Sequence, residues 1–353
     1  MDNTNILYIT FVDFDEQKSG SSVRPKKIYD AFNSIGVNVK LLEGQQNNKK
    51  SRWEKVWKYF KEIKNKKYDL CYVEPPSGVI FNICDHLLLL YISKIKKVPT
   101  GVFYRDAFWK LSEDYPKKGL KTKIIVLMHK FDWNIFKITS KVIYFPSESF
   151  AEHFHHDKKV ILMPGAEKIE GLSNGDDNTF IYVGGIEGGY GADLLLSSFK
   201  SAYNINKDIK LNLVCRNEND ITNKYKDEEW LNLFIGKSGK DELKEIYDKS
   251  KYSIVTFNKG GYMDLAVPIK LFEYISYEKP ILSTDCKEIS KIINKYNIGK
   301  VAKHNSEDLS KAIIEMISDE KSYIIYKDNI KNKVLKDSLW VDRVLVVMDT
   351  LLD

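Results

Sequence analysis

A lysine and a glutamate three residues apart are the side chains of this sequence best suited to bind an anionic, hydroxylated ligand. Lys270 and Glu273 lie in the segment 268–277, whose pattern predicts a helix. The first turn of a helix offers unpaired N–H groups and a partial positive charge, which attract anions. A lysine there opposes the helix dipole, which suggests that it meets an anion. The Glu273 carboxylate can accept hydrogen bonds from two neighbouring hydroxyls, such as those of a ribose. The alternative interpretation is an amphipathic helix with a solvated Lys–Glu pair.

The neighbouring elements must place this helix at the end of a buried strand. The run 252–257 is β-branched and aromatic, which is typical of a buried strand, and Gly260 with Gly261 ends it. Pro268 suits the start of the helix, and Pro280 begins the next strand. The helix is expected to have two faces. The face that packs on the sheet is formed by Leu271, Phe272 and Ile275. The other face is formed by Lys270, Glu273, Tyr274 and Tyr277.

The segment 264–282 resembles the donor-nucleotide motif of GT-B glycosyltransferases, in the large retaining family 4. Many members read Pro-x-Lys-x-x-Glu-Tyr and then Gly-Lys-Pro-Val-Ile, and Pro268, Lys270 and Glu273 match that pattern. The resemblance implies that Glu273 binds the nucleotide ribose and that Lys270 lies near the diphosphate. The commonest motif has another Glu eight residues earlier, which contacts the donor sugar, and this chain has Leu265 there. The residues expected around the nucleotide sugar therefore include Tyr262, Met263, Asp264 and Leu265.

The same resemblance implies an α/β fold of the GT-B type, with two doubly wound Rossmann-like domains facing a cleft. The length of 353 residues also predicts two domains. We expect an acceptor-binding domain over 1–165 and a nucleotide-sugar-binding domain over 166–335. Residues 336–353 are expected to form a helix that crosses back to the N-terminal domain.

Other strand ends of the second half are further candidates for donor binding. The strand 179–185 leads into a Gly-rich loop, which is a plausible phosphate cradle. Family members commonly have an Arg and a Lys around this loop, where this chain has Gly185 and Tyr190. Arg216, at the end of another predicted strand, is the best candidate for the missing charge, because its guanidinium suits bidentate phosphate contacts. The resemblance places Gly236 and Lys237 at the base.

The chain begins with a strand, a Gly/Ser loop and a helix, which is a dinucleotide-type βα unit. It lacks the Gly-x-Gly-x-x-Gly spacing, which argues against NAD. In GT-B enzymes this loop approaches the donor phosphates, and Gly20 would let the backbone come close. A plain capped turn is the alternative.

Acceptor binding is assigned to the strand ends of the first half, because ligands bind there in α/β folds. Glu74 ends one predicted strand, and Arg105 and Asp106 follow another. Many family members carry a His near Asp106. We predict that these three residues contact the acceptor, and that Asp106, Lys270 and Arg216 are the catalytic candidates. A buried structural Arg–Asp pair is the alternative for Arg105 and Asp106.

The first half is basic, with 28 Lys and Arg against 18 Asp and Glu over 1–165. Much of this charge lies in the helix 49–67, whose expected apolar stripe is Trp53, Val56, Trp57, Phe60 and Ile63. We favour packing of this stripe on the sheet over contact with an anionic membrane. Aromatic residues on a packing face argue against nucleic acid binding.

The sequence predicts that the protein is cytoplasmic. Peripheral association with the inner face of the membrane is a further possibility. The sequence contains no apolar run long enough for a membrane span, and its first residues lack the basic region of a signal peptide. The cysteines are scattered in apolar runs and are expected to be reduced, namely Cys71, Cys84, Cys215 and Cys286.

The predicted activity is that of a retaining, metal-independent hexosyltransferase. It would use a nucleotide sugar, with a UDP-sugar favoured, and a glycan, glycoprotein or lipid-linked acceptor. No cofactor is expected beyond this co-substrate. A non-catalytic GT-B subunit and a sugar-nucleotide epimerase are the alternatives. The sequence allows a homo-oligomer but does not specify the sugar, the acceptor or the oligomeric state.

Overall fold

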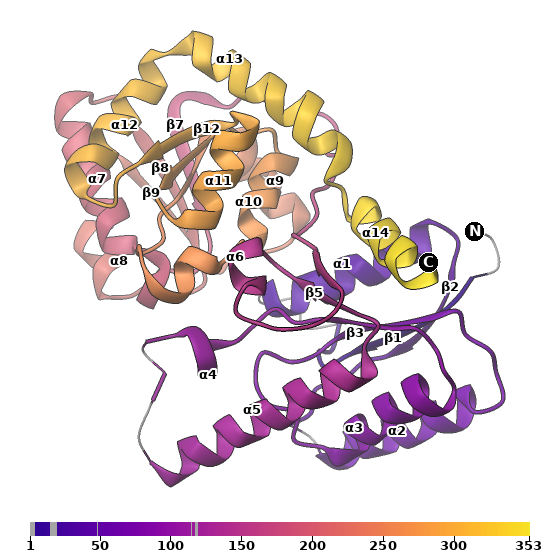
Figure 1. Cartoon of the computed structure of the whole chain (residues 1–353). Coiled ribbons are helices and arrows are strands. Elements are labelled where there is room, and N and C mark those ends of the chain that lie inside the picture. Colours follow the sequence, from indigo (N-terminus) through magenta and orange to yellow (C-terminus); the bar gives the residue numbers. More distant parts are fainter. Residues whose placement is uncertain (1–3, 15–19, 48, 114, 117–118) are drawn as a thin grey trace. The chain divides into compact units, whose positions relative to one another are not determined.

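A computed structural model describes residues 4–14, 20–47, 49–113, 115–116 and 119–353 of the chain. They form two compact units (Figure 1). The first unit comprises the residues up to Gly165 together with Trp340–Asp353, and the second comprises Ala166–Leu339. Each unit contains one six-stranded sheet in which every neighbouring pair of strands is parallel. The predicted architecture of two doubly wound α/β domains is therefore confirmed.

The first unit has the strand order β2-β1-β3-β4-β5-β6. Its strands are β1 (Asn5–Thr10), β2 (Asn38–Leu42), β3 (Leu70–Glu74), β4 (Thr100–Phe103), β5 (Val142–Phe145) and β6 (Lys159–Ile161). Its helices are α1 (Gly20–Ser34), α2 (Lys49–Ile63), α3 (Ile83–Leu90), α4 (Phe108–Leu111), α5 (Leu120–Thr139), α6 (Glu148–Ala151) and α14 (Trp340–Leu352), and a π-helical turn, Tyr91–Ile95, extends α3.

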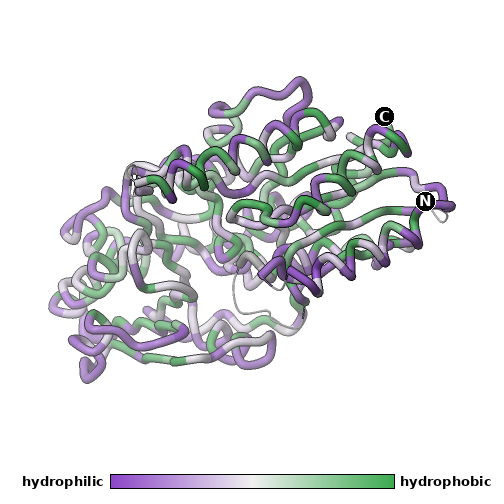
Figure 2. Tube along the Cα trace, turned by 90° about the horizontal axis from the view of Figure 1, so that it is seen from below, coloured by the Kyte–Doolittle hydropathy of each residue, from purple (hydrophilic) through white to green (hydrophobic). Residues whose placement is uncertain are grey.

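Helices cover both faces of this sheet, with α1 and α14 on one face and α2, α3 and α5 on the other (Figure 1). The apolar stripe of α14 is buried, so this helix completes the core of the first unit. Hydrophobic residues run through the strands and along the helices beside them (Figure 2). The C-terminal helix begins at Trp340 and not at 336, and residues 336–339 belong to the second unit.

The second unit has the strand order β12-β11-β10-β7-β8-β9. Its strands are β7 (Asp176–Val183), β8 (Lys210–Cys215), β9 (Leu231–Ile235), β10 (Ser250–Val255), β11 (Ile281–Thr284) and β12 (Gly299–Ala302). Its α-helices are α7 (Ala192–Ile205), α8 (Asp220–Tyr225), α9 (Lys240–Asp248), α10 (Ile269–Ser276), α11 (Lys287–Tyr296), α12 (Ser306–Ser318) and α13 (Glu320–Asn329). Its 3₁₀ helices are η2 (Gly188–Tyr190), η3 (Gly261–Leu265) and η5 (Leu335–Asp337), and a π-helical turn, η4 (Ile330–Val334), precedes η5.

Each sheet has a point at which the strand order reverses direction. In the first unit it lies between β1 and β3, and in the second between β7 and β10. Chain connections leave such a point on opposite faces of the sheet, which opens a crevice at the carboxyl ends of the strands. The residues that follow β7 and β10 are therefore the ones best placed to bind a ligand in the second unit.

The packing of α2 differs from the sequence prediction. Val56 and Ile63 of the predicted apolar stripe are buried, but Trp53 and Trp57 are 50% and 53% exposed, so the prediction is wrong for the two tryptophans. Arg52 is buried instead, because it pairs with Asp85 at 2.8 Å and donates hydrogen bonds to two backbone carbonyls. Tyr59 is also buried, and its hydroxyl donates to the carbonyl of Lys40. The argument against nucleic acid binding that rested on buried tryptophans is therefore wrong.

Candidate functional site

Lys270 lies at the reversal point of the second sheet. It occupies the first turn of α10, and its Nζ approaches the backbone at Gly184, directly after β7. A Cβ atom at Gly184 would lie 3.2 Å from this Nζ, and the residue has φ of +136°. Only glycine adopts this conformation without strain, and the absence of a side chain at Gly184 leaves space for the Lys270 amine.

Three aromatic rings surround the Lys270 ammonium. Its Nζ lies 4.1 Å from the ring centre of Tyr182, 5.2 Å from that of Tyr190 and 5.3 Å from that of Phe257. These distances are within the range of cation–π attraction. The Nζ atom is buried, and no described residue forms a hydrogen bond with it.

Burial lowers the pKa of Lys270 to about 7, and the nearby Glu273 carboxylate opposes this shift. An ammonium held by ring faces keeps all its hydrogen-bond donors available. The first N–H groups of α10 add donors at the same place. This combination of charge and donors can bind an anion such as a diphosphate.

Glu273 lies beside buried tyrosines. The rings of Tyr247 and Tyr277 stack with centres 3.8 Å apart. Burial raises the pKa of both phenols, and the negative charge of Glu273 raises it further. Tyr274 and Tyr277 belong to the helix face that was predicted to be polar, but both are buried. The helix is covered on this side by other elements of the unit, so only Lys270 and Glu273 of the predicted polar face stay partly exposed.

Tyr274 joins the two strands that separate at the reversal point. Its hydroxyl accepts a hydrogen bond from the N–H of Val183 in β7, at 2.9 Å, and donates one to the carbonyl of Ile254 in β10, at 3.3 Å. A phenol thereby satisfies backbone groups where the ladder between the strands ends. Sequence analysis missed this role because it treated Tyr274 as a polar-face residue.

Arg216, Gly236 and Lys237 follow the next two strands of the sheet. Arg216 is exposed at the end of β8, and no ion pair with another described residue forms. Gly236 donates its N–H to the carbonyl of Cys215, and its φ of +68° turns the chain at the end of β9. The Lys237 amine pairs with Glu242 at 2.8 Å. The sheet order thus brings Arg216 and Gly236 to the same edge as Lys270, while Lys237 is engaged with α9.

The Gly-rich loop 184–191 is fastened to the segment after β10. Asn258 donates its N–H to the carbonyl of Gly189 at 2.8 Å, and Thr256 donates its hydroxyl to the carbonyl of Tyr190 at 3.2 Å. Met263 lies so close to Gly189 that a Cβ there would be 3.0 Å from its side chain. Tyr190 similarly fills the space next to Gly185. The loop therefore contributes backbone and an aromatic ring to the site, and no cation.

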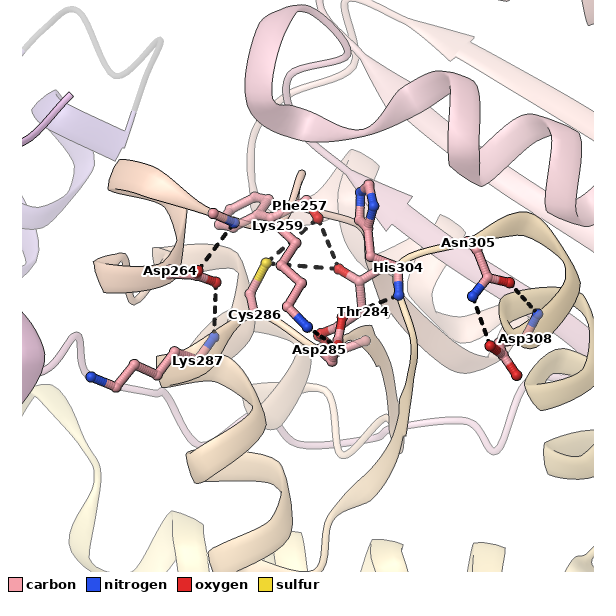
Figure 3. Close-up of polar contacts among 12 residues, drawn as sticks. Phe257, Lys259, Asp264, Thr284, Asp285, Cys286, Lys287, His304, Asn305 and Asp308 are labelled. Carbon is pink, nitrogen blue, oxygen red and sulfur yellow. Dashed lines mark hydrogen bonds and ion pairs between the residues drawn. The ribbon is translucent and has the colours of Figure 1, made fainter. Parts of the chain in front are cut away.

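Asp264 serves as a backbone cap (Figure 3). Its carboxylate accepts hydrogen bonds from the N–H of Gly260 and from the N–H of Lys287, the first residue of α11, both at 3.1 Å. Lys259 pairs with Asp285 beside it, and Asp285 accepts a hydrogen bond from the N–H of His304. These contacts hold η3, which contains Tyr262, Met263 and Leu265, against α11. Whether η3 contacts a donor sugar stays a prediction.

In the first unit, Glu74 is buried at the end of β3. Its Oε1 pairs with Arg24 Nε at 3.3 Å and accepts the Tyr72 hydroxyl at 3.0 Å. The Arg24 guanidinium stacks on Phe103, 3.6 Å from the ring centre. Neither Glu74 Oε2 nor the Arg24 Nη atoms have a hydrogen-bond partner among the described residues. Sequence analysis did not single out Arg24, although an arginine beside the buried stripe of α1 is a detectable signal.

The other predicted residues of the first unit stay predictions. Arg105 and Asp106 follow β4 and are half-buried. Gly20 is the first residue of α1, which begins earlier than the sequence suggested, and the loop before it (15–19) lies outside the described residues. Among the residues that the structure describes, no group of three or more His, Cys, Asp or Glu could hold a metal ion.

Residues 166–333 match the model of the family "Glycosyl transferases group 1". This segment covers nearly all of the second unit and contains Lys270, Glu273 and Arg216. The second unit is thus similar to group 1 of the glycosyl transferases, which agrees with the glycosyltransferase resemblance noted in the sequence. No curated protein sequence matches the chain.

Solved structures share the fold over nearly the whole chain. Sucrose-phosphate synthase from Thermosynechococcus elongatus has a TM-score of 0.70 and 10% identity, covering 98% of both chains. WaaG, a glycosyltransferase of lipopolysaccharide biosynthesis, has a TM-score of 0.65 and 13% identity, covering 98% of this chain and 99% of its own. HepE from Anabaena, in complex with UDP and glucose, has a TM-score of 0.66 and 10% identity, covering 99% of both chains. The chain therefore has the GT-B fold.

None of the described helices combines the length and the apolar character needed to cross a bilayer.

Proposed function

We propose that this protein is a hexosyltransferase that moves a sugar from a UDP-sugar to a glycan, glycoprotein or lipid-linked acceptor with retention of configuration. The observation that carries the proposal is the Lys270 ammonium, buried among aromatic rings without a hydrogen-bond partner in the described chain. A cation in this state costs free energy unless a ligand neutralises it. Its place in the first turn of α10 suits a diphosphate. The solved structure of HepE with UDP supports the choice of nucleotide.

In the proposed reaction, the second unit binds the donor. Lys270 and Arg216 contact the diphosphate and stabilise the negative charge that develops as it leaves. Glu273 accepts hydrogen bonds from the ribose hydroxyls, and the backbone after β9 meets the base. The leaving phosphate takes the proton of the acceptor hydroxyl on the same face of the sugar. No metal ion is needed, because the two side chains supply the positive charge.

The acceptor is assigned to the first unit. Asp106 and Arg105 follow β4 and are half-buried, whereas Glu74 is buried and paired with Arg24, with one buried carboxylate oxygen that has no described partner. Carboxylates of this kind bind sugar hydroxyls by accepting hydrogen bonds. We therefore retain Asp106 as the catalytic candidate of this unit.

Calorimetric titration of the full chain with UDP and GDP, in the presence of a chelator, tests the donor assignment. We expect UDP to bind, and Lys270→Met or Glu273→Ala to weaken it by about tenfold to a hundredfold, as for the loss of hydrogen bonds to a charged group. Lys321→Met, an exposed lysine of α13, is the matched control and should bind UDP normally. Unchanged UDP affinity in both site variants would refute the assignment.

A non-catalytic subunit that supports a partner transferase is the second candidate. The loop 184–191 carries no positive side chain, and the carboxylate of Asp264 is occupied by two backbone amides. These features leave fewer groups for the donor sugar. Hydrolysis or transfer of UDP-sugars by the isolated chain distinguishes the two, because a supporting subunit would bind the nucleotide without turnover.

A further inference from the structure

The first unit exposes an apolar surface on α3 and α5. The six side chains of this surface are 47% to 77% exposed, and we call it the apolar helix face, namely Ile83, Leu87, Leu120, Ile124, Leu127 and Phe131. The four members on α5 are spaced as one face of a helix. The opposite side of α5 is buried and includes His129, Asp132 and Phe136. Single exposed apolar side chains are ordinary, but a contiguous set marks an interaction surface.

Ring contacts connect this face across neighbouring helices. Phe131 of α5 lies 5.1 Å from the ring of His86 in α3. On the other side of α3, Phe60 of α2 lies 4.7 Å from Tyr91 and stacks on the exposed Trp57 at 5.4 Å. The three helices lie side by side on one face of the sheet (Figure 1). Ring contacts therefore join α5 to α3, and the turn after α3 to Trp57 of α2.

The exposed charges of α5 at this surface are positive, whereas α3 contains no lysine or arginine. Each helix contains one acidic residue, and both of these are buried in pairs, Asp85 with Arg52 and Asp132 with His86. The exposed ionisable side chains of α5 are lysines, among them Lys121, Lys123 and Lys130. Helix α5 thus presents apolar and cationic groups together, which is the composition of a helix that lies at an anionic membrane interface, and α3 adds apolar side chains beside it.

A hollow of about 470 Å³ lies where α4 meets α5. Its walls combine Lys123 and Lys130 with Trp109 and Leu127, while the amine of Lys110, a further wall residue, donates to the carbonyl of His153. Amines beside aromatic and aliphatic walls suit a group that has a phosphate at one end and hydrocarbon at the other, which is the chemistry of a lipid headgroup. The hollow adjoins the apolar helix face through Leu127, which belongs to both.

We propose that the first unit docks on an anionic lipid bilayer, with the apolar helix face inserted at the interface and the lysines of α5 on lipid phosphates. Nucleic acid is a poorer occupant, because aliphatic side chains do not stack on bases. A second copy of the chain is also poorer, because it would bring the lysines of both copies together. Sequence analysis had considered peripheral membrane contact through the basic N-terminal domain, with the helix 49–67 as its candidate segment. The inference does not rest on the proposed sugar transfer.

Flotation of the full chain with lipid vesicles tests this. Wild-type protein should float with vesicles of phosphatidylcholine and phosphatidylglycerol, and not with phosphatidylcholine alone. Leu127→Ser combined with Phe131→Ser should reduce the bound fraction at least about tenfold, since two inserted side chains are lost. The matched control, Ile324→Ser with Ile325→Ser, changes two exposed residues of α13 in the second unit and should bind as wild type.

A charge variant separates the two contributions. Lys121→Glu with Lys123→Glu should lower binding to anionic vesicles by roughly fivefold or more for each lysine, and added salt should weaken the wild type. All variants change exposed side chains, and circular dichroism checks that they fold. UDP titration of the same samples reports on the nucleotide site separately.

Several results would overturn the proposal. One is failure of the wild type to float, or equal flotation with neutral vesicles. Another is an equal loss in the α13 control. A dimer that dissociates in the Leu127/Phe131 variant would assign the face to a second copy, and retention of single-stranded RNA lost in the same variant would assign it to nucleic acid.

Discussion

Both units contain a six-stranded parallel sheet, and in each a cationic side chain lies where the strand order reverses. The two units differ in the groups that surround this cation. In the first unit, Arg24 pairs with the buried Glu74, which ends β3. In the second, Lys270 meets only ring faces and the half-buried Glu273 one turn away, and its Nζ has no hydrogen-bond partner among the described residues. The first cation has a carboxylate partner through its Nε atom, whereas the second has no carboxylate within ion-pair distance among the described residues.

This difference shows how one architecture serves two purposes. A buried ion pair is costly to break, because the remaining charge is left without a partner. A buried ammonium without a carboxylate partner is already in that costly state. Arg24 should therefore matter for stability, and Lys270 for binding.

Removing each cation in turn should give the largest contrast. Arg24→Met leaves Glu74 buried and unpaired and should lower the free energy of unfolding by about 3–5 kcal/mol. Lys270→Met should leave the free energy of unfolding unchanged or raise it, because this substitution removes an unpaired buried charge. Urea denaturation of both variants measures this. Equal destabilisation would show that the two cations are equivalent and would end the comparison.

The pH dependence of stability should sharpen the contrast. The folded-state pKa of Lys270 is lowered to about 7, below the value of about 10.4 in an unfolded chain. Between these two values the unfolded state binds more protons, so this group makes the protein more stable as the pH rises through that window. Affinity for UDP should fall over the same range, because the lysine loses its charge. Melting temperatures of wild type and Lys270→Met from pH 6 to 10 measure the first effect, and a flat difference between them would contradict it.

Asp264 should behave as a structural cap. Asp264→Ala removes the acceptor for the first N–H of α11 and should cost about 1 kcal/mol of stability, as for other helix caps. UDP affinity should stay within about twofold of wild type, because the carboxylate is turned to backbone amides. Thermal denaturation and calorimetry measure the two effects. A large loss of UDP affinity without loss of stability would assign Asp264 to the ligand.

The smallest effect is expected at Tyr190. Tyr190→Ala removes one of the three rings around Lys270, which are worth about 0.5–1 kcal/mol each at partly exposed sites. Water then reaches the ammonium, so the pKa of Lys270 should rise and the fall in UDP affinity should move to higher pH. Titrations of Tyr190→Phe, which keeps a ring, serve as the control and should match wild type.

The resemblance of the motif at 264–282 to a known family predicted the fold, and the local pattern of strand, loop and helix predicted the position of α10. It was not sufficient for the faces of the helices. Trp53 and Trp57 look like core residues in sequence, but Arg52 and Tyr59 take the buried positions because α3 and β2 supply their partners. Tyr274 was similarly assigned to the polar face, although its hydroxyl joins β7 and β10.

By itself, the sequence determined the order of strands and helices, the division into two domains and the lysine and glutamate of the donor motif. Only the tertiary structure decided which cation is neutralised. The pairing of Arg24 with Glu74 joins residues 50 positions apart, and the rings around Lys270 come from the end of β7, from η2 and from the chain after β10. Such contacts depend on which strands become neighbours, and burial then sets the electrostatic cost of each charge. Local sequence patterns specify neither the neighbouring strands nor the burial of each charge.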